Sequence, residues 1–252
     1  MHRDSRRIGL ARALSKLGYC SRSRAVETIR EGRVTLNGTL RRDPEYPAHP
    51  DKDRIAVDGE RLQPGPRIYL MMNKPRGLVT TASDEKGRQT VYSILQREES
   101  LPWVAPVGRL DKASEGLLLL TNDSEWAARV AAPETHLEKI YHVQIAKVAD
   151  EKLVHAMTKG IRTEDGEVLR VAQCRVLRAG AKSCWLEIVL DEGKNRHIRR
   201  MLAALDIEVL RLVRVAIGPL QLGELAKGSF RPLISEEKLA LDRAIKSVKP
   251  EV

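Results

Sequence analysis

The hydrophobic pattern of the N-terminal part predicts two short helices followed by short strands. Apolar positions in residues 8–17 repeat at helical spacing, and residues 22–31 form a second short amphipathic segment. Asn37 and Asp58 each precede a glycine between segments in which apolar and polar residues alternate, and such dipeptides favour tight hairpins. We therefore expect a compact helix–helix–strand domain over residues 7–64.

The pattern changes after a Gly- and Pro-containing linker at residues 65–67. Apolar runs then predict strands at residues 67–74, 116–123, 138–145, 184–190 and 209–218. Helical spacing predicts helices at residues 125–130, 195–205 and 235–246. Strands with several interspersed helices indicate an α+β fold around a mixed or antiparallel sheet. We place this domain at residues 68–235, and a C-terminal helix and tail at residues 236–252.

Positive charge is concentrated in the two N-terminal helices. The 252 residues include 44 Lys and Arg against 34 Asp and Glu, a formal net charge of +10. Residues 1–42 hold 11 basic and 3 acidic residues, whereas residues 43–65 hold 3 and 6. This surface indicates a polyanionic partner, nucleic acid before membrane, or else a plain solvated helix face. The candidate phosphate-binding residues are Arg12, Lys16, Arg22, Arg24, Arg30 and Arg33.

The composition argues against several other classes of protein. No apolar run approaches the ~20 residues that span a membrane, and the N-terminus lacks the apolar core of a signal peptide. Cys20, Cys174 and Cys184 are scattered without a C-x-x-C pair, which is typical of buried thiols in a reducing cytoplasm. The six His residues show no metal-ligand spacing, so no metal site is expected.

Asp111 lies in a turn-rich segment just before four consecutive leucines. Gly108 and Gly116 permit irregular backbone on either side of it, and Arg109 is a charged neighbour. A loop carboxylate held by a rigid strand suits catalysis. The plain alternative is a turn aspartate that caps its own backbone, and the spacing alone leaves both possibilities open.

A basic helix and an inward tyrosine are the other candidate site elements. In residues 195–205, Arg199 and Arg200 lie off the apolar stripe, where arginine can bind a phosphate, orient a carboxylate or simply face solvent. We expect His197 to be a surface or edge residue rather than a ligand or base. Tyr141 lies on the inward face of a predicted strand. It is either a core residue or the aromatic ring on which a flipped base stacks.

Four segments, in this order, resemble the pseudouridine synthases of the RsuA/RluB/RluE/RluF type, which act on ribosomal RNA. They are NKPRGLVTT, GRLDKASEGLLLLTND, KIYHVQI, and EGKNRHIRRMLAAL with VLRLVRVAIGPLQLGEL, and together they cover about residues 68–225. Residues 7–64, which contain SRSRAVETIREGRVTLNG, resemble the small αL RNA-binding domain named for a ribosomal small-subunit protein. The signature around Asp111 is highly specific to this family.

The resemblance implies an enzyme that isomerises uridine to pseudouridine in ribosomal RNA or in a ribosome assembly intermediate. It assigns the catalytic carboxylate to Asp111, the residue that packs against the target base to Tyr141, and the basic partner of the carboxylate to Arg199. It implies no metal or other cofactor. We also expect a cytoplasmic, monomeric, bacterial protein that binds no membrane. Besides the N-terminal residues, we expect RNA contacts from Arg109, Lys112, Lys194, Arg196 and Arg200.

The implied reaction needs one ionised carboxylate in a pocket that excludes water. It breaks a C–N glycosidic bond and forms a C–C bond with the same base, and water would release that base. The carboxylate acts as a nucleophile or as a base toward the ribose, and both remain open. Burial opposes ionisation, so a guanidinium is expected nearby, with Arg199 as the candidate.

Two other functions are compatible with parts of the sequence. A non-catalytic RNA-binding ribosome assembly factor needs the basic N-terminal domain but not Asp111. An RNA glycosidase or nuclease would need a second carboxylate or a set of metal ligands, which the motifs do not supply. Within the pseudouridine synthase hypothesis we expect large-subunit before small-subunit RNA, and the modified nucleotide stays open.

Overall fold

The structure is a computed structural model that describes residues 7–82, 87–96, 98 and 101–247. The chain divides into two compact units. The first unit runs to Tyr69 and includes the segments Leu95–Ala105 and Leu120–Glu125, and the second unit contains the rest of the chain. The end of the expected C-terminal tail, residues 248–252, lies outside the described residues.

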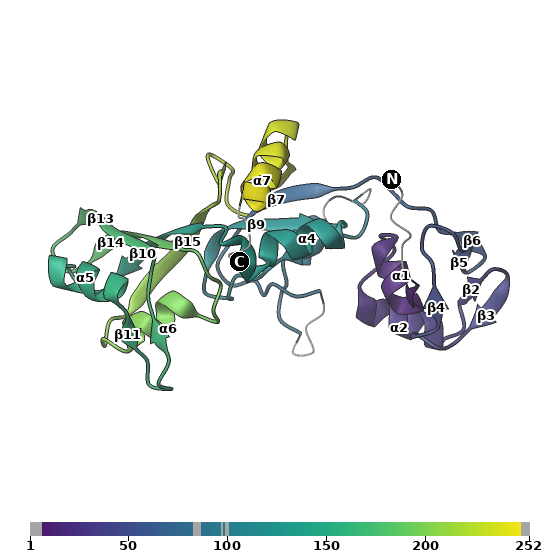
Figure 1. Ribbon diagram of the computed structural model, residues 1–252, viewed down its shortest axis with the longest axis horizontal. Helices are drawn as coiled ribbons and strands as arrows, with labels where there is room; N and C mark the ends of the chain where they lie inside the picture. Colours follow the sequence, from purple (N-terminus) through teal and green to yellow (C-terminus); the bar gives the residue numbers. More distant parts are fainter. Residues whose placement is uncertain (1–6, 83–86, 97, 99–100, 248–252) are drawn as a thin grey trace. The chain divides into compact units, whose positions relative to one another are not determined.

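Two helices and a small antiparallel sheet form the N-terminal part of the first unit (Figure 1). The helices are α1 (Leu10–Lys16) and α2 (Arg22–Arg30). The strands are β1 (Ile8–Gly9), β2 (Val34–Leu36), β3 (Thr39–Arg41), β4 (Pro47–Ala48), β5 (Ile55–Val57) and β6 (Glu60–Arg61). The sheet has the order β3-β2-β5-β6, and β1 pairs with β4. The helix–helix–strand arrangement expected from the sequence is therefore confirmed.

Local sequence signals determine where these elements begin and end. The Ser21 hydroxyl accepts a hydrogen bond of 3.2 Å from the Arg24 amide and so caps α2. Asn37 and Asp58 have positive φ angles of 53° and 50°, and the glycine after each also has positive φ. These are the conformations of a tight hairpin turn, so both predicted turns are confirmed. Leu10, Leu14, Ala25, Ile29 and Val34 are fully buried between the helices and the sheet.

A mixed sheet organises the C-terminal part of the chain. Its path is β13-β14-β10-β15-β9-β7-β17, with β8 beside β9 and β16 beside β15. β9 runs parallel to β15, whereas β10 is antiparallel to both of its neighbours, so the expected mixed sheet is confirmed. The strands are β7 (Tyr69–Lys74), β8 (Ala105–Val107), β9 (Glu115–Thr121), β10 (Lys139–Ile145), β13 (Gln173–Ala179), β14 (Cys184–Leu190), β15 (Val209–Ile217), β16 (Leu220–Gln221) and β17 (Phe230–Pro232).

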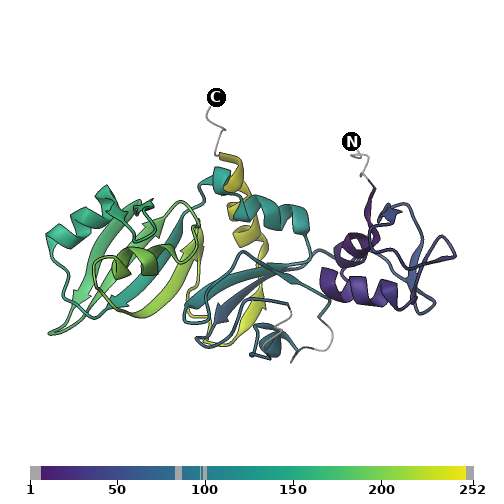
Figure 2. The same ribbon diagram turned by 90° about the horizontal axis from the view of Figure 1, so that it is seen from below.

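Helices pack against this sheet. The helices are α3 (Tyr92–Leu95), α4 (Ser124–Ala131), α5 (Glu151–Lys159), α6 (His197–Ala203) and α7 (Ser235–Ser247), with a short helical turn at Pro133–Thr135 and a small hairpin of β11 (Ile161–Arg162) and β12 (Val168–Leu169). Figure 2 shows α5 and α6 against the strands at one end of the sheet, where Met157 and Met201 are fully buried in one core cluster. Burial of this apolar face stabilises the half of the sheet that is formed by β13, β14, β10 and β15.

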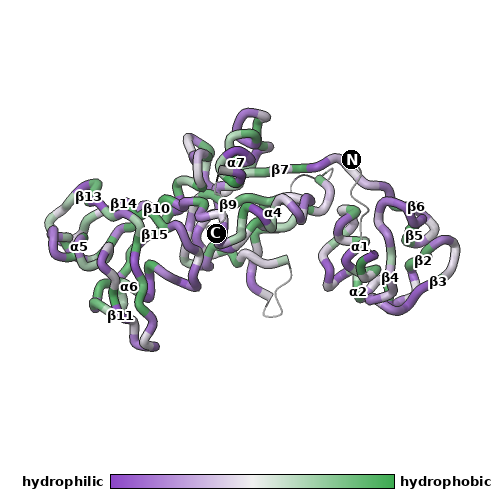
Figure 3. Tube along the Cα trace, viewed as in Figure 1, coloured by the Kyte–Doolittle hydropathy of each residue, from purple (hydrophilic) through white to green (hydrophobic). Residues whose placement is uncertain are grey.

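Strand β9 is hydrophobic along most of its length (Figure 3), and every one of its residues is buried. Its four leucines, Leu117 to Leu120, are fully buried. A strand buried on both sides loses the alternation of a half-exposed strand and becomes a continuous apolar run. The segment that precedes β9 and contains Asp111 is therefore attached to one of the most deeply buried strands of the described chain.

Candidate functional site

A buried lysine holds the backbone of the segment around Asp111. Lys74, at the end of β7, is 0% exposed, and its Nζ donates to the carbonyl oxygens of Pro75 at 3.1 Å, Asp111 at 3.1 Å and Ser114 at 2.9 Å. Burial lowers the pKa of Lys74 to about 8, and the negative charges of Asp111 and Glu115 oppose this shift. All three donors of the ammonium group are used on backbone, so Lys74 acts as a clamp.

Other donors reach the neighbouring carbonyl groups of the same segment. The Thr80 hydroxyl donates to the Leu110 carbonyl at 2.7 Å, and the Gly77 amide donates to the Lys112 carbonyl at 2.7 Å. The Ala113 carbonyl accepts a hydrogen bond of 3.0 Å from Nη2 of Arg199. With the two bonds from Lys74, every carbonyl oxygen from residue 110 to residue 114 accepts a hydrogen bond from outside the segment. We call residues 110–114 the anchored loop.

Glu115 and Gly116 join the anchored loop to β15. The Glu115 carboxylate is almost fully buried and accepts hydrogen bonds from Arg211, at 3.1 and 3.2 Å, and from Lys227. Burial raises the pKa of Glu115, but these bonds outweigh burial and hold the pKa below its ordinary value. Gly116 has a φ of 101°, and a Cβ atom there would collide with the Arg214 backbone. Only glycine allows this close parallel approach.

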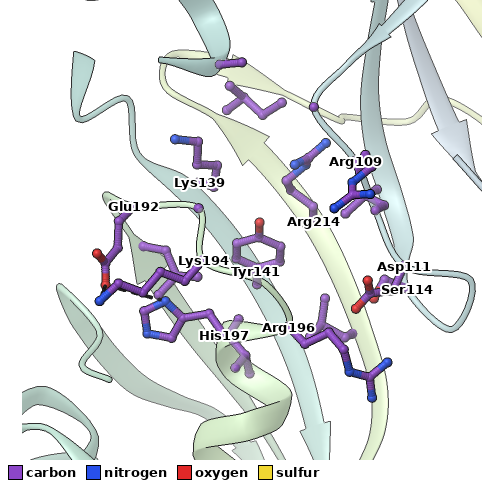
Figure 4. Close-up of a pocket in the computed structure, with 18 of the residues that line it drawn as sticks. Arg109, Asp111, Ser114, Lys139, Tyr141, Glu192, Lys194, Arg196, His197 and Arg214 are labelled. Atoms are coloured by element: carbon purple, nitrogen blue, oxygen red, sulfur yellow. Dashed lines mark ion pairs between the residues drawn. The ribbon is translucent and has the colours of Figure 1, made fainter. Parts of the chain in front are cut away.

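A cavity of about 480 Å³ opens beside the anchored loop, within the second unit. Figure 4 shows Asp111 and Tyr141 on its wall, from the anchored loop and from β10 respectively. Apolar lining residues include Val107, Leu190, Ile198, Leu212 and Ile217. The acidic lining residues are Asp111 and Glu192, and the basic ones are Arg109, Lys139, Lys194, Arg196, Arg199 and Arg214. The cavity is thus cationic overall and has an apolar floor.

The structure brings together the three residues to which the resemblance assigns catalysis. Asp111, Tyr141 and Arg199 all line this cavity. Tyr141 is half-buried and packs against the core cluster of α5 and α6. Its Cα partners are Ile188 on β14 and Arg214 on β15, so the phenol is carried by the middle of the sheet. It serves the core and the cavity at once.

The side chain of Arg199 contacts the backbone of the anchored loop and not the Asp111 side chain. Besides the bond to Ala113, its Nη1 donates to the Val209 carbonyl at 3.5 Å, and no ion pair joins it to Asp111 among the described residues. Burial lowers the pKa of Arg199, as does the charge of Arg196, whereas Asp111 raises it. The guanidinium of Arg199 therefore supports the backbone of the anchored loop in place of a direct ion pair with Asp111.

The other basic residues expected to contact RNA in the second unit lie in different surroundings. Arg109, Lys194 and Arg196 line the cavity, and Lys112 is exposed in the turn of the anchored loop. Arg200 instead forms ion pairs with Asp165 at 2.6 Å and Glu167 at 2.8 Å and is not a lining residue. Its contacts join α6 to the hairpin of β11 and β12.

The basic residues of the N-terminal helices also differ in their partners. Arg33 pairs with Asp58 and with Glu31, and Arg24 pairs with Glu27. Lys16 pairs with Glu125 within the first unit. The three residues that are exposed and form no ion pair among the described residues are Arg12, Arg22 and Arg30.

The expectation that His197 lies at the surface is wrong. His197 is the first residue of α6, is 3% exposed, and lines the cavity. Its Nδ1 lies 3.7 Å from a carboxylate oxygen of Glu192. Burial lowers the pKa of His197, and the charge of Glu192 opposes this shift. His197 and Met201 are four residues apart, so they share the inward helix face. That spacing was the signal available in the sequence.

Sequence reasoning gave no role to several residues that shape the site. Lys74 and Thr80 hold the anchored loop, and Arg214 lines the cavity from β15. A signal existed for Arg214, because Leu212 and Ala216, two positions to either side of it, place it on an apolar strand face. A charged residue is unusual on such a face. The bonds of Lys74 and Thr80 span 30 to 40 positions of the chain and could not be read from local patterns.

Two family models match the chain. Residues 68–204 match RNA pseudouridylate synthase, and residues 8–55 match the S4 domain. An RNA pseudouridine synthase of Aquifex aeolicus, itself uncharacterized, is 36% identical over 94% of this chain and 95% of its own length. The ribosomal large subunit pseudouridine synthase B of Bacillus subtilis is 32% identical over 90% of this chain and 93% of its own.

A solved structure shows the same architecture. The crystal structure of a pseudouridylate synthase superimposes with a TM-score of 0.62 at 30% sequence identity, over 94% of this chain and 100% of that chain. No helix of the described chain is long and apolar enough to cross a membrane. Within the same residues, no group of three or more His, Cys, Asp or Glu is placed to hold a metal ion.

Proposed function

The chain belongs to the RNA pseudouridylate synthase family and carries an N-terminal S4 domain, and on this premise we propose that it isomerises a specific uridine of ribosomal RNA. Asp111 is the proposed reacting carboxylate, and large-subunit RNA is the proposed substrate. The similarity to a Bacillus subtilis enzyme named for the large subunit supports this choice of RNA. We expect the enzyme to act as a cytoplasmic monomer on the RNA or on an assembly intermediate.

The observation that carries the proposal is the anchored loop. Hydrogen bonds to five consecutive carbonyl oxygens fix the backbone of Asp111 at the wall of the cavity. A reacting group must be held within a fraction of an ångström of its target, and a fixed backbone supplies that accuracy. A turn aspartate that only capped its own backbone would not need donors from three other segments of the chain.

The cavity suits a reaction in which the base is detached and used again. The apolar lining residues and the half-buried Tyr141 offer a stacked uracil a contact surface, which would keep a detached base in place for the new C–C bond. Stacking on the phenol returns part of the cost of removing the base from its RNA stack, which is a few kcal/mol. Asp111 acts on the ribose as nucleophile or as base.

The second acidic lining residue is engaged elsewhere, which favours isomerisation over hydrolysis. Hydrolytic glycosidases use two carboxylates that flank the scissile bond. Glu192 forms an ion pair of 3.1 Å with Lys194 and lies 3.7 Å from His197. We therefore give Glu192 no part in the chemistry, and Asp111 works as a single carboxylate beside the guanidinium of Arg199.

The S4 domain supplies affinity in this account. Arg12, Arg22 and Arg30 are exposed and can bind phosphates without reading the bases. Such contacts would keep the RNA near the cavity while the target nucleotide enters it.

The purified protein, incubated with ribosomal RNA from cells that lack its gene, tests the proposal. We expect one or a few uridines of the large-subunit RNA to become pseudouridine, at a rate that a metal chelator leaves unchanged. Pseudouridine mapping at single-nucleotide resolution is the readout. RNA from wild-type cells, which have the gene, is the reference. Release of free uracil, strand cleavage, or an unchanged map would contradict the proposal.

A further inference from the structure

Arg214 is a buried cation whose charge has no counter-ion in the described chain. The side chain lines the cavity and is 6% exposed. Its Nε donates to the Leu117 carbonyl at 2.7 Å, and its Nη2 is buried without a hydrogen-bond partner. No carboxylate of the described residues forms an ion pair with it. Burying an unpaired charge and an unused donor is costly, so a feature of this kind calls for an explanation.

A second cation lies beside Arg214 on the same cavity wall. Tyr141 is the Cα partner of Arg214 across β10 and β15, and Lys139 is two positions before Tyr141 on β10. Burial lowers the pKa of Lys139, and the charge of Arg214 lowers it further, whereas Asp191 opposes both effects. No ion pair is found for Lys139 among the described residues either. Figure 4 shows Lys139, Arg214 and Arg109 along one side of the cavity.

Two neighbouring cations that repel each other, and that form no ion pair among the described residues, oppose folding of this wall of the cavity. A protein can retain such an arrangement when a ligand supplies the missing negative charge. Uracil offers neutral carbonyl oxygens, whereas every RNA nucleotide brings a phosphodiester anion. The guanidinium fork matches the oxygen geometry of phosphate, and an ammonium group adds a compact charge beside it.

We propose that Arg214 and Lys139 form a subsite for a backbone phosphate of the RNA, adjoining the nucleotide that enters the cavity. The subsite rests on the proposed function only in so far as the cavity holds the target uridine. It would fix the nucleotide from its backbone side, while Tyr141 packs on the base and Asp111 faces the ribose. This arrangement divides recognition of one nucleotide among three walls of the cavity.

Binding of mononucleotides to the full chain tests the subsite without any turnover. The probes are uridine and two isomers of UMP, with the phosphate on the 5′ or on the 3′ oxygen, and calorimetry measures each dissociation constant. One isomer of UMP should bind about tenfold or more tightly than uridine, because a charge-assisted contact contributes on the order of a factor of ten. The preferred isomer identifies which side of the uridine carries the phosphate.

Substitutions assign the preference to these two residues. Lys139→Gln and Arg214→Gln should each reduce the preference for UMP over uridine by about tenfold and leave the affinity for uridine unchanged. Arg214→Lys, which keeps the charge and loses the fork, should give an intermediate value. Lys147→Gln is the matched control, because Lys147 is exposed just beyond β10 and does not line the cavity.

The outcomes separate this inference from the proposed function. Equal affinity of the wild-type protein for uridine and both UMP isomers would overturn the subsite, and so would an undiminished preference in Lys139→Gln. The latter variant decides alone if Arg214→Gln fails to fold in a thermal unfolding assay. A preserved preference for UMP in a protein that makes no pseudouridine would contradict the proposed function and support the subsite.

Discussion

The anchored loop and the basic surface of the N-terminal helices differ in how they use hydrogen bonds. In the anchored loop, the backbone carbonyls accept bonds from Lys74, Thr80, Gly77 and Arg199, so the position of the chain is fixed. On the N-terminal helices, Arg12, Arg22 and Arg30 are exposed and form no ion pair with any residue that the structure describes. The first region is built for accuracy of position, and the second for charge.

This difference follows from the physics of the two tasks. A reacting carboxylate is effective only in a narrow range of distance and angle, so its support must be rigid. Phosphate binding depends mainly on the number of positive charges near the RNA and tolerates many side-chain conformations. Substitutions in the anchored loop should therefore act on turnover, whereas substitutions on the basic helices should act on affinity and its dependence on salt.

Among the substitutions that compare the supports of the two regions, loss of the Lys74 clamp should have the largest effect. Lys74→Met removes three hydrogen bonds to backbone carbonyls, one of them the buried bond to Ser114. We expect turnover to fall by about a hundredfold or more, and the free energy of unfolding to fall by about 3–5 kcal/mol. Single-turnover kinetics and denaturant unfolding measure the two quantities.

The matched control for the clamp is Lys159→Met, at an exposed lysine in the last turn of α5. It should leave both turnover and unfolding unchanged. A Lys74→Met variant with normal turnover would show that the backbone bonds of the anchored loop do not position the carboxylate, and the contrast between the two regions would be lost.

Replacement of Glu115 should weaken stability more than turnover. Glu115→Gln leaves the charges of Arg211 and Lys227 without their buried partner, at a cost of about 3 kcal/mol near neutral pH. The folded-state pKa of Glu115 lies below its ordinary value of 4.5, so its contribution is present above that pH and is lost as the pH falls below it. The difference in unfolding free energy between wild type and variant should therefore shrink in acid. A constant difference from neutral pH to pH 3 would contradict this assignment.

Neutralising the free arginines of the N-terminal helices should have the smallest effect. Arg12→Gln, Arg22→Gln and Arg30→Gln should each weaken RNA binding by about two- to fivefold and reduce the slope of log affinity against log salt by about 1. Turnover of bound RNA should not change. Arg61→Gln is the control, because Arg61 is exposed and lies in residues 43–65, where acidic residues outnumber basic ones. A change in turnover with constant affinity would reverse the comparison.

The sequence predicted those parts of the fold that have a strong local pattern. Strands β10, β14 and β15 were recognised because one face of each is buried and apolar residues recur on it. Strand β13 was missed because nearly all of its residues are exposed at the sheet edge, which leaves no alternation to detect. Helix α5 was also missed, although Asp150 caps it and Gly160 ends it, which are recognisable signals.

The resemblance named candidate site residues, but the sequence did not indicate how the fold supports them. Asp111, Tyr141 and Arg199 were identified by resemblance, and the structure places all three around one cavity. The bonds that hold the anchored loop come from residues 30 to 86 positions away, and only the folded chain brings these donors to it. For the same reason, the sequence could not indicate that Arg199 binds the Ala113 carbonyl and forms no direct ion pair with Asp111 among the described residues.

The Asp111→Asn variant tests the central claim most directly, with pseudouridine formation and RNA affinity measured on the same preparation. We predict a loss of turnover of about a thousandfold or more with unchanged RNA affinity, because the amide keeps the shape of the loop and lacks the reactive oxygen anion. Asp206→Asn is the control and should behave as wild type. Asp206 is exposed and has a positive φ angle, which asparagine also adopts readily. Turnover at the normal rate by Asp111→Asn would contradict the account.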